Sequence, residues 1–263
     1  SRWYAQAGTP AVKSSGRYDA AKKEYRLTLT QAVAPTPGQP DKTPVRMPLR
    51  AALFDANGAK LETRLEGGEA ASEHVLLLET ASKEFVFGEV ASPPRVSLNR
   101  GFSAPIRLSD YLSEDDRAAL AGADDDAFAQ WDALQAIARA IILDAVRAGE
   151  TSANTRRLDG YVTALNNAVT RVAEHDPAYA ALLLYLPTVG ELVLDVKDAD
   201  PSAIHAIRTQ VRVAIATALE QPLLDVLSRH EPAAFDPSAA AAGRRALRSS
   251  ALSLLSSLGT RHE

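Results

Sequence analysis

The 263-residue sequence contains no cysteine. This absence excludes a disulfide framework, a thiolate metal site and a thiol nucleophile. It fits a reducing cytosol, although a chain without cysteine can also be exported. The sequence also lacks any apolar run near the roughly 18 residues of a membrane span, and it shows no secretory signal. We therefore expect a cytoplasmic protein with no membrane partner.

Basic residues do not outnumber acidic residues in this chain. The chain carries 29 basic and 33 acidic residues, a formal net charge of −4. Domains that bind nucleic acid usually concentrate basic residues on one face, so we expect no nucleic-acid partner. Hydrophobic residues make up 46% of the chain, enough to bury a core, and the length suffices for one large or two ordinary domains.

The histidines lack the spacing of a zinc protease. Such an enzyme places two histidines four residues apart on a helix, with a glutamate beside the first as general base. No pair among the five histidines has this spacing. We expect surface or capping roles for the four that have a glutamate neighbour, and a partly buried position at a core edge for His205. The four are His74, His175, His230 and His262.

Other catalytic signatures are absent too. The sequence contains no nucleophile-elbow serine motif, no P-loop and no dinucleotide-binding glycine fingerprint. The acidic runs Glu114–Asp116 and Asp124–Asp126 lack the spacing of a calcium loop, whereas negative charge is favoured at helix starts. We therefore predict no catalytic residue and no metal ligand in this chain.

The first hundred residues favour short strands. Tyr25, Leu27 and Leu29 alternate with polar residues, the period of a half-buried strand. A strand over 47–54 is followed by Asn57-Gly58, which supplies the positive φ angles of a tight hairpin turn. Further strands are expected over the ranges 61–65, 75–78, 85–87 and 96–98. The proline-rich stretch 35–40 is predicted to be a loop between strands.

After residue 108 the apolar residues recur at helical spacing. Ser113 and Asp116 signal a helix start, and Gly122 a plausible stop. A long helix is expected to follow Asp124–Asp126 and to end at Gly149.

Capping signals recur along the C-terminal half. A helix over 158–172 precedes three Asp-Pro steps, in which the aspartate can cap and the proline can occupy the first helical position. The steps are Asp176-Pro177, Asp200-Pro201 and Asp236-Pro237. Thr188 and Glu191 form a further capping box.

These patterns predict two domains of different class. Residues 1–107 are expected to form an immunoglobulin-like antiparallel β-sandwich, and residues 108–263 an all-α helical-repeat domain of the armadillo or HEAT kind. The last apolar helix stops close to residue 263 without the polar cap of a solenoid, so we expect the helical domain to be truncated. The chain opens on Ser1 rather than methionine, which also favours an excised or processed fragment.

Six ordered strings carry a family resemblance. They are Trp3–Pro10 (WYAQAGTP), Tyr25–Gln31 (YRLTLTQ), Leu98–Pro105 (LNRGFSAP), Phe128–Gln135 (FAQWDALQ), and Asp176–Ala178 followed by Leu186–Leu192 (LPTVGEL). In this order they resemble the part of bacterial alanyl aminopeptidases (aminopeptidase N, gluzincin zinc metallopeptidases) that follows the catalytic domain. The resemblance runs from Trp3 to beyond Leu192, and Leu98–Pro105 is its sharpest block.

The resemblance implies a parent protein that is a zinc-dependent exopeptidase removing N-terminal residues from peptides. The zinc-binding helix would lie in a catalytic domain ahead of residue 1, so the resemblance assigns no catalytic or metal residue here. It implies that the sandwich is a spacer and that the helical domain closes over the active site and restricts entry to small peptides. The expected partners are the parent's own catalytic domain and, through it, peptide substrates; a monomer is expected.

Four residues are candidates for contacts with that catalytic domain: Trp3, Tyr4, Gly8 and Pro10. Packing within the sandwich explains them equally well. An alternative function is an independent module that binds protein or carbohydrate, with the helices as scaffold. Such a module favours an exposed aromatic platform, but aromatic residues make up only 6% of the chain and mostly occupy core-patterned positions. The sequence therefore favours the aminopeptidase interpretation.

Overall fold

The computed structural model describes residues 2–229 and 236–259. They form two compact units. One, here called the sandwich unit, comprises the chain up to Asp116 together with Ala123–Ala129. The other, here called the helical unit, comprises Arg117–Gly122 and the chain from Gln130 onward.

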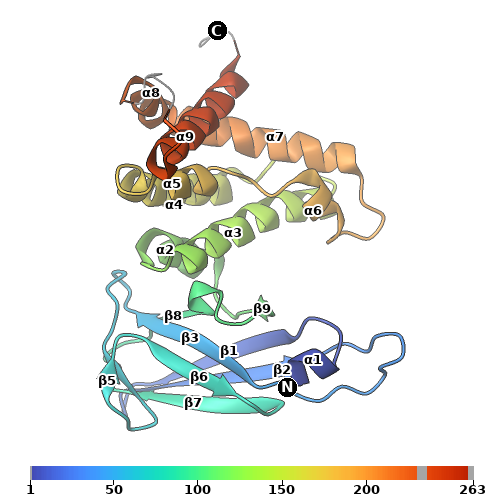
Figure 1. The fold of residues 1–263 in the computed structure, drawn as a ribbon, viewed down its shortest axis with the longest axis vertical. Helices are drawn as coiled ribbons and strands as arrows, with labels where there is room; N and C mark the ends of the chain where they lie inside the picture. The colour runs from blue at the N-terminus through green and yellow to red at the C-terminus, as the bar shows by residue number, and fades with distance from the viewer. Residues whose placement is uncertain (1, 230–235, 260–263) are drawn as a thin grey trace. The chain divides into compact units, whose positions relative to one another are not determined.

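The sandwich unit consists of a short helix and short strands (Figure 1). Its elements are α1 (Arg2–Ala5), β1 (Ala11–Asp19), β2 (Glu24–Ala32), β3 (Met47–Phe54), β4 (Thr63–Leu65), β5 (Ala70–Ala71), β6 (His74–Leu78), β7 (Ser82–Gly88), β8 (Arg95–Leu98), the 3-10 turn η1 (Arg100–Phe102) and β9 (Arg107–Ser109).

The strands form two sheets that share one core. The larger sheet has the order β5-β4-β7-β2-β1-β9 and the smaller one the order β6-β3-β8. In the larger sheet Leu27 lies opposite Phe85, and both side chains are buried together with Leu49 and Leu76 of the smaller sheet. Two sheets packed over a common apolar layer constitute the predicted immunoglobulin-like sandwich.

Two details of the sandwich differ from the sequence prediction. Strand β1 was not predicted, because Val12 is its only fully buried residue and the strand lacks alternation. The turn at Asn57-Gly58 exists, with Gly58 at φ 82° and Asp55 N donating to Ala59 O at 2.9 Å. The chain returns beside β3 only over Lys60 and Leu61, where Lys60 bridges Phe54 and Leu61 N donates to Leu53 O at 2.8 Å. The rest of the expected strand lies in the other sheet, where β4 pairs with β5 and β7.

The helices follow one another through short connections (Figure 1). They are α2 (Glu114–Ala123), α3 (Ala127–Arg147), α4 (Thr155–Val172), α5 (Pro177–Leu183), α6 (Val189–Val193), α7 (Pro201–Ala218), α8 (Glu220–Arg229), α9 (Ala239–Leu255) and the 3-10 turn η2 (Ser256–Leu258).

Capping side chains fix several of these helix starts. Asp176 accepts from Tyr179 N at 2.9 Å, and Asp200 accepts from Ser202 N at 2.8 Å, each with proline at the first helical position. The predicted capping box at Thr188 is complete in both directions. The third Asp-Pro step is different, because Ser238 rather than Asp236 caps α9. Asp236 instead accepts from Ser238 N at 2.9 Å and holds that cap in place.

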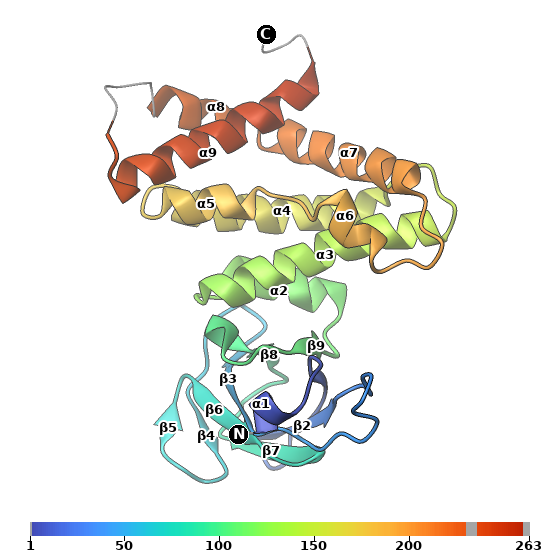
Figure 2. The same cartoon turned by 45° about the vertical axis from the view of Figure 1, so that its right-hand side comes forward.

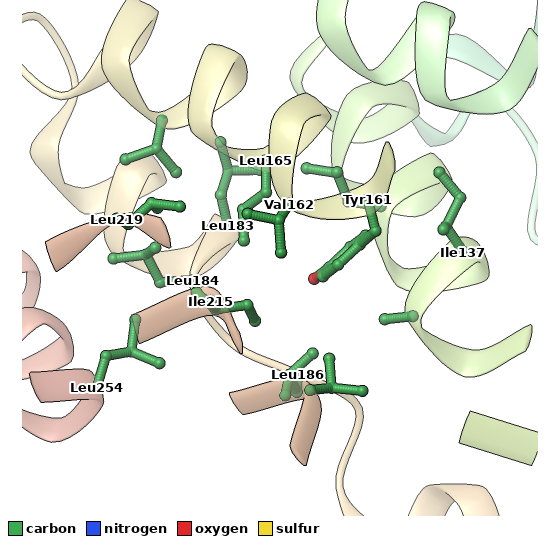
Figure 3. Close-up of a cluster of buried hydrophobic side chains, with 14 of the residues drawn as sticks. Ile137, Tyr161, Val162, Leu165, Leu183, Leu184, Leu186, Ile215, Leu219 and Leu254 are labelled. Atoms are coloured by element: carbon green, nitrogen blue, oxygen red, sulfur yellow. The ribbon is translucent and has the colours of Figure 1, made fainter. Parts of the chain in front are cut away.

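Within the helical unit the helices stack in successive layers. Figure 2 shows α4 and α5 lying between α3 on one side and α7 and α9 on the other. One apolar core runs through the layers, and the close-up in Figure 3 shows Tyr161, Leu165 and Ile215 within it. A stack of amphipathic helices around a continuous core is the predicted armadillo-like arrangement.

Leu165 is a direct test of this core. It is 0% exposed, whereas Leu194 in the same unit is 85% exposed. Leu165→Ala should lower the free energy of unfolding by about 2–5 kcal/mol, since it deletes buried methyl groups and leaves a cavity. Leu194→Ala should change it by less than about 0.5 kcal/mol. Urea unfolding followed by helical circular dichroism measures both, and equal losses would contradict the packing described.

Candidate functional site

The described residues contain no group of three His, Cys, Asp or Glu side chains that could hold a metal ion. No helix among them is both long and apolar enough to cross a membrane. Among residues 2–229 and 236–259 we therefore assign none to the zinc site that the family resemblance implies.

The histidine expectations need correction in two places. His74, expected at the surface, is only 8% exposed; its Nε2 lies 2.9 Å from Thr63 Oγ1, and its ring packs edge-on against Phe87. Burial lowers the pKa of His74, so the neutral imidazole is favoured as a core group. His205, expected at a core edge, is exposed, as is His175. The remaining two, His230 and His262, lie outside the described residues.

A cluster of charged side chains surrounds Arg100 in the sandwich unit. Arg100 follows strand β8 and is only 2% exposed. Its Nε donates to Glu73 Oε2 at 2.8 Å, its Nη2 donates to Asp125 Oδ1 at 2.5 Å, and its Nη1 donates to Asp124 Oδ1. The guanidinium thus meets three carboxylates, two of which come from the acidic run ahead of α3. We call these four residues the Arg100 cluster.

Two further cations complete the cluster's surroundings. Arg50 Nε donates to Glu73 Oε1 at 2.6 Å, and Lys60 Nζ donates to Asp125 Oδ2 at 2.5 Å. The acidic run was predicted to act through helix-start electrostatics. That role belongs to Asp126, whose Oδ1 accepts from Ala129 N at 2.9 Å in the first turn of α3. Asp124 and Asp125 instead neutralise Arg100.

A left-handed turn places Arg100 within reach of these partners. Asn99, Gly101 and Phe102 have φ angles of 57°, 60° and 51°. Asn99 Oδ1 stabilises the turn by accepting from Ala104 N at 2.9 Å, and Gly101 N donates to Asp126 Oδ1 at 2.9 Å. The positive φ at Gly101 favours glycine, whereas the Arg50 Nη1 that lies 2.7 Å from an added Cβ ends a flexible side chain that can shift.

The electrostatics of the cluster differ from one carboxylate to the next. Burial raises the pKa of Asp125, but hydrogen bonds from Lys60 and Arg100 outweigh burial and hold that pKa at about 2. For Glu73 the bonds from Arg100 and Arg50 likewise outweigh burial and lower the pKa. For Asp124 burial dominates and raises the pKa. Arg100 donates through all three of its nitrogens, and the bonds described use four of its five N–H groups, so the cluster is built to hold structure together.

The four residues proposed as contacts to a further domain lie near the start of the sandwich unit. Trp3 packs against the sandwich core, and its Nε1 donates to Arg46 O at 2.8 Å. Pro10 is buried, and its carbonyl accepts from Arg107 N at 2.9 Å. Tyr4 is 94% exposed and Gly8 is exposed, with φ 99° at Gly8. Trp3 and Pro10 therefore have partners within the unit, whereas the Tyr4 side chain projects from it.

Sequence reasoning did not identify the Arg100 cluster as a site. Its members are far apart in the chain: Glu73 precedes Arg100 by 27 residues, and Asp124 follows it by 24. One signal was available, because Leu98–Pro105 is the sharpest block of the family resemblance and has Arg100 at its centre. The motif identified the position of Arg100 but not the carboxylates that bind it.

Removing the Arg100 charge tests the cluster. Arg100→Met should lower the free energy of unfolding of the sandwich unit by about 3–5 kcal/mol, because it leaves Asp124 buried without its counter-charge. The control is Arg46→Met, since the Arg46–Glu79 pair has side chains 69% and 52% exposed. An exposed pair contributes at most about 1 kcal/mol. Urea unfolding reported by Trp3 fluorescence, in a Trp131→Phe background, measures both; equal effects would contradict a structural role.

The cluster also predicts the response to acid. Lowered pKa values at Asp125 and Glu73 mean that the unfolded chain binds more protons, so their stabilisation is complete above pH 4.5 and is lost as the pH falls towards 2. The raised pKa of Asp124 acts in the opposite direction. We expect stability to fall over this window, less steeply in Arg100→Met. Urea midpoints at several pH values check this, and identical slopes would exclude the cluster as the cause.

Known proteins match the chain along nearly its whole length. Residues 8–111 match a family model described as "Domain of unknown function (DUF3458) Ig-like fold", and residues 114–263 match "Domain of unknown function (DUF3458_C) ARM repeats". Three curated relatives named aminopeptidase N match as well. The one from Caulobacter vibrioides is 39% identical over 97% of this chain, that from Haemophilus influenzae 35% over 86%, and that from Escherichia coli 31% over 97%.

The match covers only a part of each relative. The chain spans 28%, 26% and 29% of the three aminopeptidase N sequences. Among solved structures, Legionella pneumophila aminopeptidase A in complex with aspartic acid aligns with 97% of this chain and 28% of its own, at a TM-score of 0.77 and 21% identity. At this identity the structure shows a shared fold. The chain belongs to the DUF3458 family, in which an Ig-like domain is followed by ARM repeats.

Proposed function

We propose that this chain is a non-catalytic, C-terminal portion of a zinc-dependent aminopeptidase. One observation carries the proposal: proteins named aminopeptidase N match 97% of the chain, yet the chain makes up only 28% and 29% of two of them. The catalytic groups and the zinc of the whole protein would lie in the remaining length. The whole protein would remove N-terminal amino acids from peptides.

In this proposal the sandwich is a spacer, and two features support that role. The Arg100 cluster joins Asp124 and Asp125, just ahead of α3, to the sandwich through charged side chains, and residues 123–129 belong to the sandwich unit. In addition, the sandwich core is filled by aromatic and aliphatic side chains, as expected of a structural domain. The proposed boundary between the two domains lies after residue 107.

The helical domain would contribute to the cover that restricts substrate access to small peptides. Stacked helix pairs suit this role, because they present an extended surface while burying a continuous core. The partners would be the protein's own catalytic domain and peptides held by it. A cytoplasmic monomer without nucleic-acid contacts fits the composition of the chain.

Trp3, Tyr4, Gly8 and Pro10 are the proposed contacts with the catalytic domain. Tyr4 is the strongest of them, because its ring is 94% exposed beside a tryptophan that is itself anchored. Hydrogen exchange compares the segment 3–10 in this chain and in the full-length protein. Slower exchange in the full-length protein is expected, and unchanged exchange would remove the segment from the interface.

Turnover of an alanine chromogenic amide tests the proposed function. The purified chain with added zinc should give no hydrolysis, since its described residues bring no metal-binding group together. The full-length protein should hydrolyse the amide, and a chelator should stop it. Chelator-sensitive turnover by the chain alone would overturn the non-catalytic assignment. An inactive full-length protein would overturn the proposed aminopeptidase activity.

A further inference from the structure

The helical unit contains a cavity of about 310 Å³. It lies among the segment that follows α5, helix α7 and helix α9. The residues that line it are Leu184, Tyr185, Leu186, Arg208, Arg212, Ser249, Ser250, Ser253 and Leu254. Its volume falls at the lower end of the range of small-molecule sites in proteins, roughly 300–1,000 Å³.

Two arginines of α7 give the cavity its charge. Arg208 and Arg212 are four residues apart, one helical turn, so both side chains lie on the same face. Arg208 donates to the carbonyls of Pro187 and Leu186, and Arg212 donates to Ser253, but neither forms an ion pair with a described carboxylate. Burial and the neighbouring charge of Arg212 lower the pKa of Arg208, which supports the closeness of the two cations.

The guanidinium groups keep donors free. Each has five N–H groups, and the bonds described use two on Arg208 and two on Arg212. The nearest carboxylate that acts on Arg208 is Glu191, whose Oε2 accepts from Thr188 N and Thr188 Oγ1 in the capping box. The pair of positive charges is therefore uncompensated by the residues that line the cavity.

A third polar group points to a ligand independently. Ser250 is only 7% exposed, lines the cavity, and its Oγ has no hydrogen-bond partner among the described residues. A buried hydroxyl without a partner costs free energy, so native proteins rarely leave one unsatisfied. A bound acceptor in the cavity would satisfy it.

The remaining wall of the cavity is apolar. Leu184, Leu186 and Leu254 belong to the buried core, where the close-up shows them (Figure 3). Tyr185 adds a ring that is 60% exposed. The cavity thus offers cationic donors and a hydroxyl beside aliphatic surface, a combination that suits a molecule with one anionic end and one apolar side group. Inorganic phosphate would use the donors but not the leucines.

We propose that this cavity binds the carboxylate of a small organic acid, with the guanidinium groups of Arg208 and Arg212 on the carboxylate oxygens and the apolar side group against the leucines. Planar guanidinium groups pair well with carboxylate oxygens, and Ser250 Oγ supplies one more donor. This site goes beyond the proposed function and does not depend on it, because binding is measured on the chain itself.

Calorimetry on the whole 263-residue chain tests the proposal with N-acetyl-leucine as probe. N-acetyl-leucine amide has the same apolar group without the charge and should bind at least about tenfold more weakly. Inorganic phosphate, the anion without the apolar group, should also bind more weakly. No binding of the acid, or equal binding of acid and amide, would overturn the proposal; phosphate binding as tight as the acid would reduce the site to a general anion site and overturn the role of the leucines.

Variants locate the binding. Arg212→Gln should weaken N-acetyl-leucine binding by about tenfold or more, whereas Arg244→Gln, which makes the same change at an exposed position of α9, should leave it unchanged. Ser250→Ala should weaken binding several-fold without lowering stability, since its hydroxyl has no partner in the free chain. The Ser250→Ala variant therefore still tests the site if Arg212→Gln does not fold. Unaltered affinity in a folded Arg212→Gln or in Ser250→Ala would refute the site.

An N-acetylated tripeptide that ends in leucine distinguishes the source of the carboxylate. If the tripeptide binds as tightly as the single residue, the cavity accepts the carboxyl end of a peptide. If only the single residue binds, the ligand is a free organic acid. Either result supports recognition of a terminal carboxylate beside an apolar side chain.

Discussion

The burial of the Arg100 guanidinium is the constraint on which the sandwich unit depends. A guanidinium cannot lose its proton in a protein, so once it is 2% exposed it must be surrounded by negative charge and acceptors. Glu73 and two aspartates meet this requirement, and the aspartates belong to the segment that starts α3. The need to neutralise one cation therefore ties Asp124 and Asp125, just ahead of α3, to the turn that follows β8.

The left-handed turn at Asn99–Phe102 follows from the same constraint. Residues other than glycine avoid positive φ, and holding Asn99 and Phe102 there costs free energy. That cost is offset by the Asn99 side-chain bonds and by the ion pairs that the turn makes available to Arg100. The strain is confined to this turn, whereas the ion pairs that it permits join the segment ahead of β6, through Glu73, to the segment ahead of α3.

The sequence predicts the elements of this chain better than it predicts their pairing. Alternating Tyr25, Leu27 and Leu29 identify β2, and Asp176 and Asp200 mark helix starts, because these signals lie within a few neighbouring residues. Whether the chain after Gly58 returns beside β3 or crosses to the other sheet depends on packing between distant strands. Strand β1 escapes detection for a related reason, since its long pairing with β2 is made by the backbone and needs little apolar side chain.

For the same reason, the sequence alone does not predict the two arginine sites, because each brings together residues that are distant in the chain. Arg100 lies in η1, and its partners come from the segments that precede β6 and α3. Arg208, Arg212 and Ser250 come from helices about forty residues apart. Periodicity places Arg208 on a helix face, but it does not reveal which helix packs against that face or whether a carboxylate arrives with it. Only the three-dimensional structure distinguishes an arginine that is neutralised by carboxylates from one that forms no ion pair.

That distinction carries the functional argument. Around Arg100 three carboxylates neutralise the guanidinium and accept most of its hydrogen bonds, which makes the group part of the framework. Around Arg208 and Arg212 the protein supplies carbonyls and hydroxyls but no described ion pair, and it leaves Ser250 Oγ without an acceptor. Two neighbouring cations repel each other, so such a pair is retained at a cost unless an anion joins them. An organic carboxylate in the cavity would satisfy both cations and the hydroxyl at once.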